Sequence, residues 1–176
     1  MRLALITDLH LGLDATCVYY NRLLGPQAEP IATAALQTLN QSGADLTIIL
    51  GDITHDGRTS DLTLTRELFS RLKMPWFVLP GNHDTDAVKS GAFDQIFGEH
   101  AAQGYVRRGD IGMLFVRDAH PEASCASESF LVGPSQAASL IAAAAQDPAP
   151  LLFLFAHAPL LSAQAYAEEQ GGPYPG

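Results

Sequence analysis

The sequence predicts a single α/β domain built around a largely parallel or mixed sheet. Short apolar runs alternate along the chain with segments of helical periodicity, which is typical of layered α/β domains. Most of these runs are continuously apolar, as expected for strands that are covered on both faces. At 176 residues, the chain is long enough for one domain with a substantial core and short for two.

Five short segments are predicted as strands: residues 2–7, 46–50, 76–79, 113–117 and 151–155. Residues 105–118 also have the pattern of a β-hairpin whose turn lies near Gly109 and Asp110. Four segments between or after the strands are predicted as helices: residues 30–41, 60–72, 86–97 and 134–146.

Local signals support the helices to different degrees. The first has Pro30 in its first turn and Gly43 just beyond its end, the usual order of these residues. Ser60 can cap the second. The third is interrupted by Gly91, and the fourth is rich in alanine, with Leu140 and Ile141 for its buried face.

Composition and charge narrow the classes of partner. The formal net charge of −9 disfavours nucleic acids and anionic membranes, whose binding depends largely on Lys and Arg. The two cysteines, Cys17 and Cys125, lie far apart and are expected to be free thiols in a reducing compartment. The N-terminal apolar run is too short for a signal peptide, so we expect a soluble, cytoplasmic protein.

Polar side chains follow four of the predicted strands. They occur in the segments Asp8-Leu9-His10, Gly51-Asp52, Gly81-Asn82-His83-Asp84 and Ala156-His157. The loops at the carboxyl ends of such strands collect functional groups at one edge of the sheet. Carboxylate, imidazole and carboxamide suit Mn, Fe or Zn, and the lack of thiolates argues against a structural zinc site.

The spacing within these segments suits metal binding. In an extended chain, Asp8 and His10 point the same way and can bind one ion. A glycine before Asp52 and another before Asn82 allow backbone to approach a metal centre closely. Two ions about 3.5–4 Å apart would stabilise both the attacking and the departing oxygen of a phosphoryl displacement.

Four ordered motifs resemble a known family. They read ITDLHLG at 6–12, LGDITHDG at 50–57, PGNHD at 80–84 and AHAP at 156–159. Together they resemble the calcineurin-like metallophosphoesterases, most of all the class III cyclic-nucleotide phosphodiesterase and glycerophosphodiesterase branch. The resemblance extends from residue 2 to about residue 159 and implies one metallophosphoesterase domain over 1–176 with a four-layer α/β/β/α sandwich, incomplete at its C-terminal end.

The resemblance also implies a set of metal ligands. Asp8 and His10 would bind the first of two divalent or trivalent ions, Mn, Fe or Zn. Asp52 would bridge both ions, while Asn82 and His157 would bind the second.

Further residues of the motifs are implied in catalysis and substrate binding. His83 would contact the phosphate together with Asn82 and protonate the leaving oxygen. Asp84 would either orient His83 or support the loop. Where the family often has an aspartate that orients the catalytic histidine, this chain has His55, which could touch substrate or metal, or Asp56 could take over that role.

The function implied is hydrolysis of small phosphodiesters, of cyclic nucleotide or glycerophosphodiester type, by metal-bound hydroxide. The alternatives are a phosphomonoesterase or nuclease of the same fold, or a non-catalytic, metal-deficient remnant. The expected partner is a small phosphorylated substrate; no membrane is expected, nucleic acid is disfavoured, and an oligomer stays open.

One departure from the family concerns the end of the sequence. The family completes both metal sites with a late Gly-His-x-His segment, which this sequence lacks, so one imidazole per ion is missing. We expect a fragment of a longer protein; the alternative is a truncated version that binds metal poorly. Such a chain would expose a sheet edge and apolar surface.

Other polar residues lie outside the residues assigned to metal or phosphate. Arg22 and Arg58 could contact phosphate, although a solvated surface position is expected for both. A surface or loop position is also expected for His100, His120 and Asp118, and residues 19–21 could line the substrate site.

Overall fold

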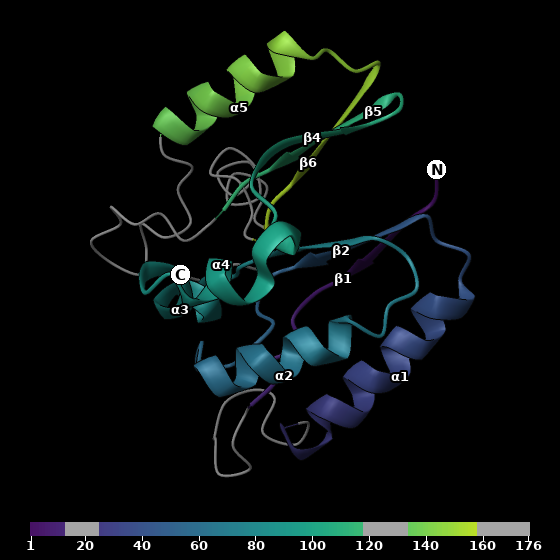
Figure 1. The fold of residues 1–176 in the computed structure, drawn as a ribbon, viewed down its shortest axis with the longest axis vertical. Coiled ribbons are helices and arrows are strands. Elements are labelled where there is room, and N and C mark those ends of the chain that lie inside the picture. The colour runs from purple at the N-terminus through teal and green to yellow at the C-terminus, as the bar shows by residue number, and fades with distance from the viewer. Residues whose placement is uncertain (13–24, 118–133, 158–176) are drawn as a thin grey trace, which may run out of the picture.

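The computed structural model describes residues 1–12, 25–117 and 134–157 (Figure 1). In chain order, the elements are β1 (Leu3–Ile6), η1 (Gly25–Gln27), α1 (Ala28–Gln41), β2 (Leu46–Leu50), α2 (Thr59–Phe69), β3 (Trp76–Leu79), η2 (Asn82–Asp84), α3 (Thr85–Lys89), α4 (Ala92–Phe97), η3 (Gly98–His100), β4 (Gly104–Arg108), β5 (Ile111–Phe115), α5 (Pro134–Gln146) and β6 (Leu151–Phe155). The protein is a mixed α/β structure, as predicted.

The strands form two three-stranded sheets. In the first, β2 lies between β1 and β3, and both pairings are parallel, with Ile49 opposite Ile6 and Val78. In the second, β5 lies between β4, which is antiparallel to it, and β6, which is parallel. The predicted hairpin is present and turns at Gly109 and Asp110. The hairpin belongs to the second sheet. The alternation of strands and helices in the sequence did not indicate that there are two sheets.

The core lies on both faces of the first sheet. Ile49 and Val78 pack with apolar residues of α1, α2 and α4 on one face. Ile48 and Leu79 pack on the other face with Met113 of the second sheet. Helix α5 contacts β4 and β5 of that second sheet (Figure 1). Strand β2 is therefore buried on both faces, as its continuous apolar run predicts.

Most predicted elements are confirmed, with exceptions in three helices. Ile141, predicted with Leu140 on the buried face of α5, is 70% exposed, because adjacent residues of a helix point in different directions. Ser60 lies within α2 and does not cap it, since α2 begins at Thr59. Residues 86–97 were predicted as one helix, but Gly91 takes a left-handed conformation (φ +77°) and separates α3 from α4. A left-handed residue cannot continue a right-handed helix. None of the helices in the described ranges combines the length and apolar character needed to cross a membrane.

Among the described residues, strand β6 lies at the edge of the second sheet and is unusually apolar for that position. Residues 151–154 are Leu, Leu, Phe and Leu, and each is between 42% and 55% exposed. An exposed apolar edge strand of this kind favours association with other chains.

Candidate metal centre

The polar loops after β1 and β2 are joined by backbone hydrogen bonds at one edge of the first sheet. The Asp8 N–H donates to the Gly51 carbonyl (3.1 Å), and the His10 N–H donates to the Asp52 carbonyl (2.9 Å). These bonds join the two loops just beyond the ends of β1 and β2. The side chains of Asp8 and His10 therefore lie close to that of Asp52.

All five predicted metal ligands meet around the carboxylate of Asp52, which is only 4% exposed. Its Oδ2 lies 3.6 Å from His10 Nε2, and that nitrogen lies 3.7 Å from Asp8 Oδ1. Its Oδ1 lies 3.4 Å from His157 Nε2, and that nitrogen lies 3.1 Å from Asn82 Oδ1. Each carboxylate oxygen therefore faces a different group of ligands.

His157 is oriented as metal-binding histidines usually are. Its Nδ1–H donates to the Leu50 carbonyl (2.6 Å), so Nε2 points at the oxygens of Asn82 and Asp52. Burial alone would lower the pKa of His157, but the hydrogen bond to Asp52 outweighs it and raises the pKa to about 9. Without metal, an Nε2 proton lies between these oxygens. A cation fits the same position, because it would replace that proton among three electron-pair donors.

The other group suits a cation as well. Asp8, His10 and Asp52 offer ligand atoms that all lie within 4.8 Å of one another. Burial lowers the pKa of His10, against the attraction of Asp52, and so favours the neutral imidazole that metals bind. Burial would raise the pKa of Asp52, but hydrogen bonds from His157 and the His83 N–H outweigh it and lower the pKa, which keeps the carboxylate ionised.

Three of these ligands have a left-handed backbone although none is glycine. The φ angles are +56° at Asp8, +44° at His10 and +48° at Asp52. Such conformations are rare outside glycine, cost about 1–3 kcal/mol each, and are concentrated at functional sites. The Asp8-Leu9-His10 segment is therefore not extended, contrary to the prediction from its spacing; Asp8 and His10 face the same centre through left-handed turns instead.

Two glycines allow the loops to approach closely, as the spacing predicts. A Cβ on Gly81 would lie 2.2 Å from Asp52 Oδ1, and one on Gly51 would lie 2.7 Å from the His157 ring. No side chain fits at either position without displacing a ligand.

His83 lies beside this centre, together with His55. The His83 backbone N–H donates to Asp52 Oδ1 (2.9 Å), and its Nδ1–H donates to the His55 carbonyl (2.7 Å). Its ring centroid lies 4.7 Å from that of His10 and 4.9 Å from that of His55. Of the alternatives left open for His55 and Asp56, the structure places His55 against His83, whereas Asp56 pairs with the exposed Arg58 (2.7 Å).

Asp84 is fully buried and bonded to the surrounding loops. Its carboxylate accepts hydrogen bonds from the backbone N–H groups of Gly81 (3.0 Å), Ile53 (3.1 Å) and Thr54 (3.1 Å), and from the Thr54 hydroxyl (2.8 Å). Burial raises its pKa, and these hydrogen bonds offset part of the rise. These contacts support the loop, one of the two roles considered for Asp84. Thr54 was not identified from the sequence as a partner of Asp84. Its position two residues after Asp52 was the only signal in the sequence that could have indicated this role.

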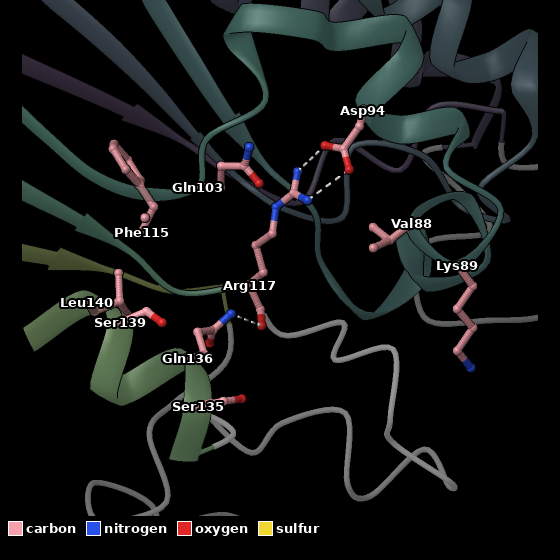
Figure 2. Close-up of a pocket in the computed structure, with 11 residues that line it drawn as sticks. Val88, Lys89, Asp94, Gln103, Phe115, Arg117, Ser135, Gln136, Ser139 and Leu140 are labelled. Atoms are coloured by element: carbon pink, nitrogen blue, oxygen red, sulfur yellow. Dashed lines mark hydrogen bonds and ion pairs between the residues drawn. The ribbon is translucent and has the colours of Figure 1, made fainter. Parts of the chain in front are cut away.

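A cavity of about 580 Å³ lies elsewhere, among α3, α4, the second sheet and α5 (Figure 2). Arg117 extends through it to a two-bonded ion pair with Asp94, at 2.6 and 3.1 Å. None of the predicted metal ligands lines this cavity.

The remaining assignments fall in different places. His100 stacks on Trp76, with ring centroids 3.8 Å apart. Several of the residues considered lie outside the described ranges: Cys17, residues 19–21, Arg22, Asp118, His120 and Cys125.

Comparison with curated proteins finds partial matches. The chain is 33% identical over 84 residues to a probable cyclic nucleotide phosphodiesterase of Synechococcus sp., a match covering 48% of this chain and 31% of that relative. It is 45% identical over 40 residues to a probable glycerophosphodiester phosphodiesterase of Arcobacter nitrofigilis, covering 23% of this chain and 15% of that relative. The matched segments thus span less than a third of each relative.

Two further comparisons cover most of the chain. A solved protein of unknown function from Aquifex aeolicus is 15% identical with a TM-score of 0.39, covering 85% of this chain and 75% of that one. The family model for calcineurin-like phosphoesterases matches residues 1–173. The resemblance seen in the ordered motifs is confirmed by that match and by the names of both curated relatives. The chain belongs to the calcineurin-like phosphoesterase family.

Proposed function

We propose that this chain hydrolyses phosphodiesters with the help of two metal ions held on either side of Asp52. The observation that carries the proposal is the division of its carboxylate, whose Oδ2 faces His10 and whose Oδ1 faces His157. A carboxylate with one oxygen directed at each of two ligand groups suits a bridge between two cations. Mn, Fe and Zn all accept this set of oxygen and nitrogen ligands.

The side chains of the centre then have separate tasks. Asp8 and His10 hold one ion, Asn82 and His157 hold the other, and Asp52 binds both. When bound, the two ions supply a water of lowered pKa as nucleophile and neutralise charge on the phosphate. His83 donates its Nδ1–H to the His55 carbonyl, which leaves Nε2 to contact the phosphate and deliver a proton to the leaving oxygen.

A small phosphodiester is the substrate that fits best. Both curated relatives are named as phosphodiesterases, one for cyclic nucleotides and one for glycerophosphodiesters. The net charge of −9 disfavours a nuclease, which needs a basic surface. We also propose the α/β/β/α sandwich implied by the family, in which α1, α2 and α4 cover the first sheet and α5 covers the second.

Metal analysis and hydrolysis of two model substrates test the proposal. The protein is loaded with Mn²⁺, its metal content is measured by ICP-MS, and turnover of bis(p-nitrophenyl) phosphate is compared with that of p-nitrophenyl phosphate. We expect two ions per chain and preference for the diester. Asp52→Asn, which tolerates the left-handed backbone, should lower turnover at least a hundredfold, whereas Asp110→Asn in the β4–β5 turn should change it less than twofold.

The alternatives give different results. Preference for the monoester would replace the proposal with a phosphomonoesterase. Bound metal with no turnover of either substrate, or no bound metal at all, would overturn it in favour of a non-catalytic domain.

A further inference from the structure

Three histidines from three different loops form a cluster that the proposed bridging centre does not explain. One ring nitrogen each from His10, His55 and His83 lies within 4.8 Å of the others. The ring centroids are 4.7 Å (His10–His83), 4.9 Å (His55–His83) and 5.6 Å (His10–His55) apart. The proposed function uses only His10 of these as a metal ligand.

We propose that these three imidazoles form a competing zinc site, and that zinc held there inhibits the enzyme. The inhibition, though not the zinc binding, rests on the proposed function. His10 belongs to this group and also to the group with Asp8 and Asp52. A neutral imidazole has a single lone pair to offer a metal, so the two modes of metal binding exclude each other.

The chemistry of the cluster selects zinc. Three imidazoles with a fourth position left to water make a common zinc site, and nitrogen ligands favour Zn²⁺ strongly over Mn²⁺. With Zn–N bonds of about 2.0–2.1 Å, the nitrogens of a tetrahedral site lie roughly 3.4 Å apart. Side-chain rotations of His10 and His55 that bring their nitrogens closer to His83 and to each other by about 1.5 Å or less would reach that geometry.

A second observation supports metal binding by His83. Its Nδ1–H already donates to the carbonyl of His55, which fixes the ring and directs Nε2 away from that bond. Metal-binding histidines are usually held in this way by a carbonyl or carboxylate on the other nitrogen. His55 thus contributes to the cluster twice, through its carbonyl and through its ring.

Occupation of this site has a direct consequence for catalysis. The lone pair of His83 that binds zinc is the one that would otherwise carry the proton for the leaving oxygen. His10 would also be withdrawn from the bridging centre. Excess zinc should therefore inhibit a manganese-loaded enzyme, and a chelator that prefers zinc should restore its activity.

The test measures zinc binding in a background where the bridging centre is weakened. Asp52→Asn removes the bridging carboxylate and keeps an oxygen that can accept the His83 N–H bond. Zinc affinity is measured by competition with a chromophoric chelator, and Co²⁺ absorption reports the ligand set. Adding His55→Gln should lower zinc affinity at least thirtyfold, while adding His100→Gln, a histidine stacked on Trp76 away from the cluster, should change it less than twofold.

The outcomes separate this proposal from the proposed function. Unchanged zinc affinity on adding His55→Gln, or no zinc binding by Asp52→Asn while circular dichroism shows a folded protein, would overturn the zinc site. Equal zinc sensitivity of manganese-loaded wild type and His55→Gln would overturn the inhibition, whereas we expect at least a tenfold higher inhibitory concentration for the variant. Failure of the proposed function would instead appear as absent turnover in the manganese-loaded wild type, with zinc binding to Asp52→Asn unaffected.

Discussion

Valine in place of two buried threonines, Thr54 and Thr47, should affect the stability of the protein differently: Thr54→Val should lower it, whereas Thr47→Val should not. Both residues are 0% exposed. The Thr54 hydroxyl donates to Asp84 Oδ1 (2.8 Å) and accepts the Gly57 N–H (3.0 Å). The Thr47 hydroxyl, in β2, has no hydrogen-bond partner within the part of the chain that the structure describes. The two substitutions therefore make the same chemical change in two different hydrogen-bonding environments.

The size of each effect follows from these contacts. A hydrogen bond to a buried carboxylate contributes about 1.5–3 kcal/mol, and leaving the Gly57 N–H without its acceptor costs about 1 kcal/mol more. Thr54→Val should therefore lower the free energy of unfolding by about 2.5–4 kcal/mol. A buried hydroxyl without a partner costs about 1–3 kcal/mol, so Thr47→Val should be neutral or stabilising by about 1 kcal/mol.

Urea unfolding measures both changes. The transition is followed by circular dichroism and by the fluorescence of Trp76, the single tryptophan of the chain. The midpoints are compared at equal slope, so that differences report stability rather than compactness. A loss of similar size in both variants, or a change below about 0.5 kcal/mol for Thr54→Val, would refute the role given to the Thr54 hydroxyl.

Three further changes test other parts of the structure. Gly81→Ala should weaken Mn²⁺ binding at least tenfold by calorimetry, because its Cβ would lie 2.2 Å from Asp52 Oδ1. Gly109→Ala strains a left-handed backbone (φ +60°) in the β4–β5 turn, but its Cβ would meet nothing within 4 Å, so it should leave Mn²⁺ binding unchanged; equal weakening by both would contradict the close approach. The pKa of His157 is raised to about 9, so its ring must lose a proton before metal binds. The affinity for Mn²⁺ should therefore rise about tenfold from pH 7 to pH 8, and an affinity independent of pH would contradict the protonation of His157. Arg117→Met removes the bidentate ion pair with Asp94 from a side chain that is 12% exposed. It should lower the melting temperature by about 2–6 °C, and an unchanged melting temperature would show that the ion pair does not stabilise the fold.

The local elements could be predicted because their signals are local. Strands β2, β3 and β6 have the predicted bounds, since each is a short apolar run with polar or turn residues on both sides. The division into two sheets could not be predicted in this way. It depends on β5 pairing with β6, which follows it only after some 35 intervening residues, and on which face of β2 the second sheet covers.

The convergence of the predicted ligands was predictable from the sequence. Donors at the ends of parallel strands must meet at one edge of the sheet, so Asp8, Asp52 and Asn82 could be brought together from chain order and spacing. The contact of His55 with His10 and His83 could not, because it depends on the relative positions of three loops. The roles proposed for the individual ligands remain predictions for the experiments above.

The left-handed backbone at Asp8, His10 and Asp52 has a consequence for how metal enters the centre. The fold has already imposed the turns that aim these donors, so an arriving ion has little chain ordering left to bring about. We expect a preorganised centre, whose loading leaves the backbone almost unmoved. The left-handed backbone also restricts which residues can replace Asp8, His10 and Asp52 during evolution. Asparagine or glycine can adopt this conformation, whereas a β-branched residue would shift the loop whatever the chemistry of its side chain.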